Sequence, residues 1–270
     1  MSKFSISTAW EESKGLLARD GRLFASVALA LIVLPAVIAG VIDPRGPGEV
    51  DAPRWFDLVV LVISLISMGG QLALIRLALG PSVTVAGAVS HGLGRLLPYI
   101  VALVILGLAA IVLSIPFGMA AIAMGLNIEQ GTIESLSGPV ALLLFAMVLL
   151  FLFIAVRFLM TMPVASAERV GPFEILKRSW SLTEGHWLRL FLFLLVALFA
   201  AVLILATVSM VVGSLVLILF GSAEPMSVGA LIGALVESVF TGIFSVLFTL
   251  MLTRIYVQLS GRDTVEKAAA

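Results

Sequence analysis

The chain has 270 residues, of which 61% are hydrophobic and 12% are charged. Soluble domains carry about 25% charged residues, so this composition excludes a disordered chain and argues strongly against a soluble globular protein, whose interior is too small to bury so much apolar surface. Basic and acidic residues both number 16, which leaves no excess charge for binding nucleic acid, and the absence of cysteine excludes disulfides and thiolate metal sites.

Six stretches carry almost no charge and are long enough to cross a bilayer as helices. A helix rises about 1.5 Å per residue, so about 20 residues match a hydrocarbon core of about 30 Å. In lipid, each backbone polar group needs an internal partner, which a helix supplies. Pro116 is expected to kink or end the third span. The predicted spans are about 23–42, 58–80, 96–116, 140–163, 190–215 and 232–256.

Lysine and arginine are distributed unequally between the two sides of the predicted membrane. The connection after the first span holds Arg45 and Arg54, and the two later connections on that side hold Glu129, Glu134 and Glu224 but no basic residue. The other side therefore carries 14 of the 16 basic residues. Because basic residues concentrate in cytoplasmic segments, we predict that the N- and C-termini are cytoplasmic.

Short segments before the first, third and fifth spans have the apolar spacing of amphipathic helices. We expect them at about 5–20, 82–94 and 172–185, lying in the membrane interface. The stripe of the first is Ile6, Trp10, Ser13 and Leu17, and that of the last is Phe173, Leu176, Trp180 and Trp187.

The last of these segments also carries signals for its two ends. Pro172 suits a first helical turn, and Gly185 suits a stop before the next span. Glu174 precedes Arg178 by four residues, a spacing that predicts an ion pair along the helix.

The same order of elements recurs along the chain. The odd-numbered spans begin with Arg22-Leu-Phe, Arg95-Leu-Leu and Arg189-Leu-Phe, and the even-numbered spans end near Arg76, Arg157 and Arg254. We therefore predict an all-α membrane protein of six transmembrane helices built as three repeated units, each with an amphipathic helix and two spans. The alternative is that arginine gathers at cytoplasmic helix ends without any repeat.

Residues 157–192 contain an ordered set of short motifs. These are Glu168, Gly171-Pro172, Lys177-Arg178-Ser179-Trp180, Leu182-Thr183 and Gly185-His186-Trp187. The set resembles the bacterial membrane proteins classed with the glycerophosphoryl diester phosphodiesterase membrane domain. The resemblance implies six spans with cytoplasmic amphipathic helices in a bacterial inner membrane. Some members also carry a metal-dependent phosphodiesterase barrel. The 270 residues contain no such barrel, so the resemblance does not imply that activity here.

Charged residues inside the spans are the first group of candidate functional residues. Placing an arginine at mid-membrane costs about 2.5–3.5 kcal/mol of insertion free energy. Such residues are therefore functional candidates unless their side chains extend along the helix to the membrane interface. The embedded candidates are Arg76, Arg157, Glu237 and Arg254. The candidates at the cytoplasmic interface are Trp10, Arg178, Trp180, His186, Trp187 and Arg189.

Known catalytic motifs are absent from the sequence. His91 and His186 are too few for a metal site without added carboxylates, so we expect no enzyme activity, cofactor or metal. The predicted function is a scaffold, assembly or lipid-interacting role, with membrane lipids and a cytoplasmic or membrane protein as candidate partners. The alternative is a transporter of small molecules or lipids in which Arg157 and Glu237 line the path.

Overall fold

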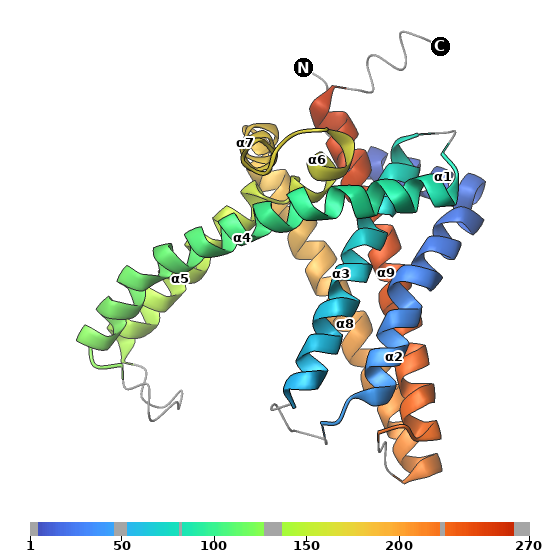
Figure 1. Ribbon diagram of the computed structural model, residues 1–270. Helices are drawn as coiled ribbons and strands as arrows, with labels where there is room; N and C mark the ends of the chain where they lie inside the picture. The colour runs from blue at the N-terminus through green and yellow to red at the C-terminus, as the bar shows by residue number, and fades with distance from the viewer. Residues whose placement is uncertain (1–4, 46–52, 81–82, 127–136, 222–224, 262–270) are drawn as a thin grey trace.

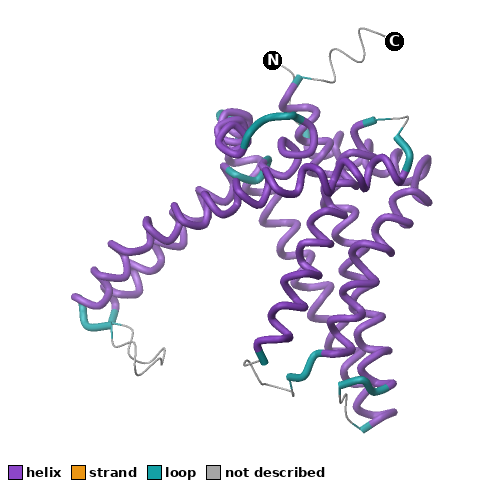
Figure 2. The backbone as a smooth tube through the Cα atoms, in the orientation of Figure 1, coloured by secondary structure: helices purple, strands orange, loops and turns teal. Residues whose placement is uncertain are grey.

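The computed structural model describes residues 5–45, 53–80, 83–126, 137–221 and 225–261. These residues form helices joined by short loops and contain no strand (Figure 2). The acidic residues of two predicted connections, Glu129, Glu134 and Glu224, lie outside the described residues. The helices are α1 (Ile6–Ala28), the π-helix η1 (Leu29–Val33), α2 (Leu34–Ile42), α3 (Arg54–Leu79), α4 (Val85–Ala123), α5 (Gly138–Arg157), α6 (Thr161–Ala167), α7 (Pro172–Thr183), α8 (Trp187–Phe220) and α9 (Val228–Ser260).

Six helical stretches are long and apolar enough to cross a membrane, which confirms the prediction of an all-helical, multi-pass membrane protein. The first comprises α1, η1 and α2 and runs from Ile6 to Ile42. Within it, Asp20 has non-helical backbone angles, with φ −120° and ψ 15°. This break separates the predicted segment 5–20 from the apolar run that follows it.

The third span differs from the prediction. We expected a separate segment at 82–94 and an end or a kink at Pro116. Helix α4 does not end at Pro116, since it is one helix that begins at Val85 and continues through Pro98 and Pro116 to Ala123. Residue 82 lies outside the described residues. A proline removes one backbone hydrogen bond, whereas a helix end inside lipid leaves about four carbonyls without partners. Continuing the helix is therefore the less costly arrangement.

The helices form a bundle and a separate arm (Figure 1). In the bundle, α9 contacts α1, η1, α2, α3 and α8. Helix α4 crosses α3 very closely, because a Cβ atom added at Gly92 would lie 2.5 Å from the carbonyl oxygen of Gly69. Beyond this crossing, α4 and α5 lie side by side and run away from the bundle, and α5 keeps contacts with α7 and α8.

Helices α6 and α7 cover one end of the bundle. We use the name α6–α7 layer for these two helices and the helix ends that contact them. Both ends of the described chain lie near this layer, since the hydroxyl of Tyr256 donates to Glu168 at the end of α6, and the backbone N–H of Ser5 donates to Oε1 of Gln258 over 3.1 Å. Helix α7 begins with Pro172 in its first turn, and Gly185 follows it with φ +77°, as the sequence predicted. The three-unit repeat remains a prediction.

Candidate functional site

The α6–α7 layer is fixed to the bundle by donors from α4. Arg95 donates from Nε to the carbonyl of Ala165 over 2.7 Å, and from Nη2 to the carbonyls of Glu168 and Val170 over 2.8 and 2.9 Å. One turn earlier, His91 Nε2 lies 2.8 Å from the carbonyl oxygen of Ser166. Because the last carbonyls of a helix have no partner within it, these two side chains complete the C-terminal end of α6.

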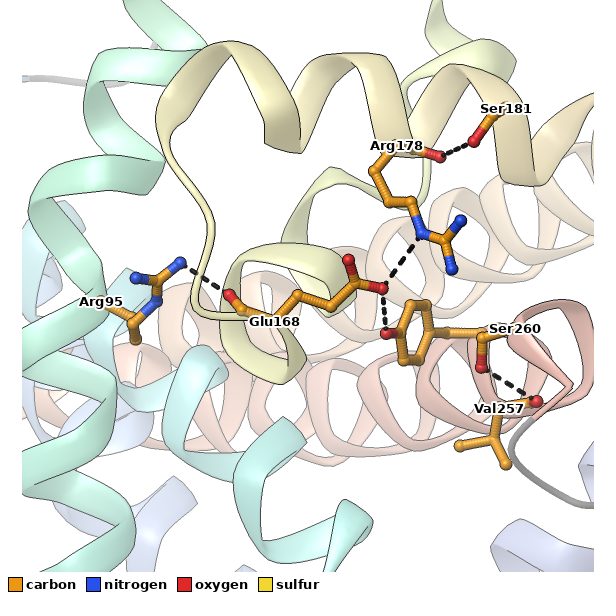
Figure 3. Close-up of polar contacts among 7 residues, drawn as sticks. Arg95, Glu168, Arg178, Ser181, Val257 and Ser260 are labelled. Atoms are coloured by element: carbon orange, nitrogen blue, oxygen red, sulfur yellow. Dashed lines mark hydrogen bonds and ion pairs between the residues drawn. The ribbon is translucent and has the colours of Figure 1, made fainter. Parts of the chain in front are cut away.

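Glu168 joins α6, α7 and α9 through its carboxylate (Figure 3). Its Oε1 accepts a hydrogen bond from the hydroxyl of the fully buried Tyr256 over 2.7 Å, and another from Nε of Arg178 over 3.2 Å. The predicted pair of Glu174 with Arg178 is therefore wrong. Glu174 instead faces the start of its own helix and accepts from the backbone N–H of Gly171 over 3.4 Å. Arg178 pairs with Glu168 because α7 packs back over the end of α6.

Arg157, the last residue of α5, lies in an aromatic cluster. The carbon atom Cζ of its guanidinium is 4.9 Å from the centre of the Trp180 ring and 5.2 Å from that of Phe153. Phe153 also packs on Trp187, with ring centres 5.7 Å apart. The backbone carbonyl of Arg157 accepts hydrogen bonds from Ser179 and Thr183, which attaches α7 to the end of α5.

Three donors in this cluster have no acceptor among the described residues: Nε and Nη1 of Arg157 and Nε1 of Trp187. All three are buried. Buried donors in proteins are usually satisfied by protein, water or ligand, so they mark a place where an acceptor such as a phosphate or carboxylate oxygen would be stabilised. The sequence singled out all of these residues except Phe153, whose role depends on the packing of α5 against α7.

The outer face of α7 is aromatic and basic. Phe173 is 72% exposed and Trp180 is 41% exposed, and both share this face with the exposed Lys177. The buried face instead consists of Ile175, Ser179, Leu182 and Thr183. Within the predicted stripe, Phe173 and Trp180 are exposed, whereas Leu176 and Trp187 are partly buried against the core.

The remaining embedded candidates lie in separate places. Arg254 of α9 donates to the carbonyl of Ala78 over 3.1 Å, near the end of α3, and Arg76 is partly buried on the last turn of α3. Glu237 is exposed on α9 and accepts a weak hydrogen bond from Ser209 of α8 over 3.5 Å. The described contacts place Arg157 and Glu237 between different pairs of helices.

The other interface candidates do not share one site. Trp10 is exposed on α1, with Nζ of Lys14 5.9 Å from its ring centre. Nδ1 of His186 lies 3.1 Å from the carbonyl oxygen of Glu184, and Arg189 is exposed at the start of α8. Across the described ranges, no three His, Asp or Glu side chains are grouped as metal ligands.

Sequence reasoning missed the roles of Arg95, His91, Glu168 and Tyr256. Arg95 and Glu168 belong to motifs noted above, so these motifs were a usable signal. The contacts of Arg95 and His91 with the end of α6, and of Tyr256 with Glu168, were not readable, because each joins residues 70 or more positions apart. The contact of Arg178 with Glu168 spans ten positions but depends on the turn between α6 and α7.

The family model described as a domain of unknown function, DUF7847, matches residues 5–259. The searches of curated proteins and of solved structures gave no match. The family match thus extends over both the bundle and the arm.

Proposed function

The chain belongs to the DUF7847 family, and we propose that it is a non-enzymatic, lipid-interacting protein of a bacterial inner membrane. In this proposal, the α6–α7 layer faces the cytoplasm and holds the outer face of α7 against the head groups of anionic lipids. The observation that carries it is the set of unpaired donors of Arg157 and Trp187 beside the exposed aromatic and basic face of α7. The resemblance to the glycerophosphoryl diester phosphodiesterase membrane domain, and the amphipathic character of α7, belong to the same proposal.

Physical chemistry supports this use of α7. Tryptophan and phenylalanine favour the layer between hydrocarbon and water, and each basic side chain near an anionic surface contributes about 1 kcal/mol of attraction. The attachment of α7 through Glu168 and Arg95 supplies a fixed orientation for this face. A helix that is already ordered loses less conformational freedom on binding than a free segment does.

The contact of α7 with lipid can be tested with a spin label, since the chain has no native cysteine. We expect a label on Phe173→Cys, in reconstituted vesicles, to be shielded from a water-soluble relaxing agent more strongly in phosphatidylglycerol than in phosphatidylcholine. Combining it with Lys177→Gln and Arg157→Gln should remove most of this lipid dependence, because about 1 kcal/mol is lost per basic group. Power-saturation electron paramagnetic resonance measures the shielding.

A label on Arg54→Cys, at the opposite end of α3, is the matched control and should show no such dependence. Equal and high accessibility at position 173 in both lipids would contradict the proposal and favour docking of a soluble partner. The alternative function, transport along a path lined by Arg157 and Glu237, is supported by the exposed carboxylate of Glu237 within a span. It would prevail if Arg157→Leu abolished the cellular activity while substitutions at Trp180 and Trp187 had no effect.

The proposed orientation has its own support at the opposite end of the bundle. There, Arg45 donates to the carboxylate of Asp43 over 2.8 Å, and this contact holds the pKa of Asp43 below its usual value. The positive charge of Arg45 is thus locally compensated, whereas the α6–α7 end carries most of the basic residues.

We expect single cysteines to report the two sides differently in spheroplasts. A membrane-impermeant maleimide should label Arg54→Cys in intact spheroplasts, and Lys177→Cys only after permeabilisation, because the α6–α7 layer faces the cytoplasm. Both positions are exposed in the structure. Labelling of Lys177→Cys without permeabilisation would reverse the orientation.

A further inference from the structure

An apolar groove lies between α1, η1 and α9, away from the aromatic cluster. Its volume is about 280 Å³, near the lower end of the range for ligand pockets, roughly 300 Å³. Its walls are almost wholly apolar and include Phe24, Ala25 and Leu29 on one side and Ile243 and Val246 on the other. Ala25, Leu29 and Ile243 are exposed, so the groove is open along its side.

The close crossing of the two walls forms the narrow part of this groove. A Cβ atom at Gly242 would lie 2.5 Å from Cγ2 of Val33, so the backbone of α9 at Gly242 packs directly against the side chain of Val33 in η1. Leu29 and Val33, which begin and end the π-helix, both line the groove. A π-helical turn displaces side chains from regular α-helical positions and is frequent at functional sites.

The groove continues into an open hollow at the break in α1, whose lining includes the charged residues Arg19, Asp20 and Arg22. This second hollow has a volume of about 590 Å³ and is lined by residues 17–23, and it shares Leu17 and Gly21 with the groove. Arg19 in this hollow is paired with Asp20 over 2.7 Å. Arg22 is exposed, and its guanidinium has no ion pair within the described ranges. Arg22 also directly precedes the charge-free run 23–42, so it marks the edge of the apolar layer.

We infer that the α1–α9 groove binds one anionic phospholipid, with an acyl chain in the apolar part and the phosphate at Arg22. The apolar walls of the groove match the hydrocarbon chain, and the unpaired guanidinium of Arg22 at its end matches the negative head group. Arg19 adds little charge, because Asp20 already neutralises it. The inference rests on the proposed function only in placing the α6–α7 end at the anionic leaflet. It adds one phospholipid bound in the α1–α9 groove to the proposed contact of the α7 face with lipid head groups.

The test is native mass spectrometry of the delipidated full-length protein titrated with phosphatidylglycerol and, separately, with phosphatidylcholine of the same acyl chains. Ala25→Phe should lower the affinity for phosphatidylglycerol at least tenfold, since the phenyl ring fills the groove. Ile243→Trp, from the opposite wall, should do the same. Arg22→Gln should lower it about fivefold, as expected for one basic group at an anionic lipid. It should lower phosphatidylcholine binding less, because the choline ammonium offsets the charge of that lipid's phosphate.

The matched controls are Ala109→Phe, at an exposed alanine of α4 outside the groove, and Arg54→Gln at the other end of the bundle. Both should bind phosphatidylglycerol as the wild type does. Wild-type affinity in both groove variants would overturn the inference, and so would a loss with Arg22→Gln that is equal for both lipids. Lys177→Gln should not change this binding, so failure of the α7 proposal would be seen separately.

Discussion

Replacing Arg95 with alanine is expected to lower the free energy of unfolding by about 3 kcal/mol. A hydrogen bond to a charged group contributes about 1.5–3 kcal/mol, and the three bonds of Arg95 together contribute less than their sum because they are partly exposed to solvent. The guanidinium donates to three carbonyls between Ala165 and Val170, and no other described side chain donates to these oxygens. Without it, the end of α6 and the start of α7 lose three of their hydrogen bonds to α4, and the contact of His91 with Ser166 remains. Thermal unfolding in detergent measures the loss.

Arg95→Lys and Arg169→Ala are the controls for this prediction. Lysine keeps the charge but carries only one nitrogen, so it cannot reach carbonyls in two directions, and an intermediate loss is expected. Arg169 is exposed and lies in the same loop as the carbonyl acceptors, so its removal should change the free energy of unfolding by less than about 0.5 kcal/mol. Equal losses for Arg95→Ala and Arg169→Ala would show that charge, and not hydrogen bonding, stabilises this layer.

Opposite effects are expected for two glycines on one turn of α4. Gly92→Ala should destabilise the protein by about 1–3 kcal/mol, because its Cβ would meet the backbone of α3, at 2.5 Å from the oxygen of Gly69 and 2.9 Å from the nitrogen of Ala73. Neither backbone atom can move without shifting a helix. Gly94→Ala has no atom within 4 Å of its added Cβ and should stabilise the protein by about 0.5–1 kcal/mol, the helix preference of alanine over glycine.

The same unfolding measurement decides this pair. Both substitutions add one methyl group to the same helix, so their effects on helix propensity cancel in the difference. That difference reports the crossing of α3 and α4 alone. A Gly92→Ala protein as stable as Gly94→Ala would show that the two helices do not approach this closely.

The sequence alone determined the number of spans and several of the breaks between them. Free energy of transfer into lipid adds up along a run of residues, so hydropathy and length predict a span whatever it packs against. Backbone conformation is similarly local, which is why Pro172 and Gly185 bounded α7 correctly. Of the two outcomes expected at Pro116, a kink or an end, the end was wrong, because in lipid an interrupted helix leaves more backbone groups without partners than a continued one.

Only the tertiary structure decided which partner each polar side chain has. By spacing, Arg178 had Glu174 within reach, yet it pairs with Glu168 once α7 folds over α6. Gly92 and Gly94 are equivalent in the sequence, but one faces α3 and the other faces open space. Such choices depend on how neighbouring helices turn and pack against one another. Local periodicity carries no information about them, so the α6–α7 layer and the α1–α9 groove became visible only in three dimensions.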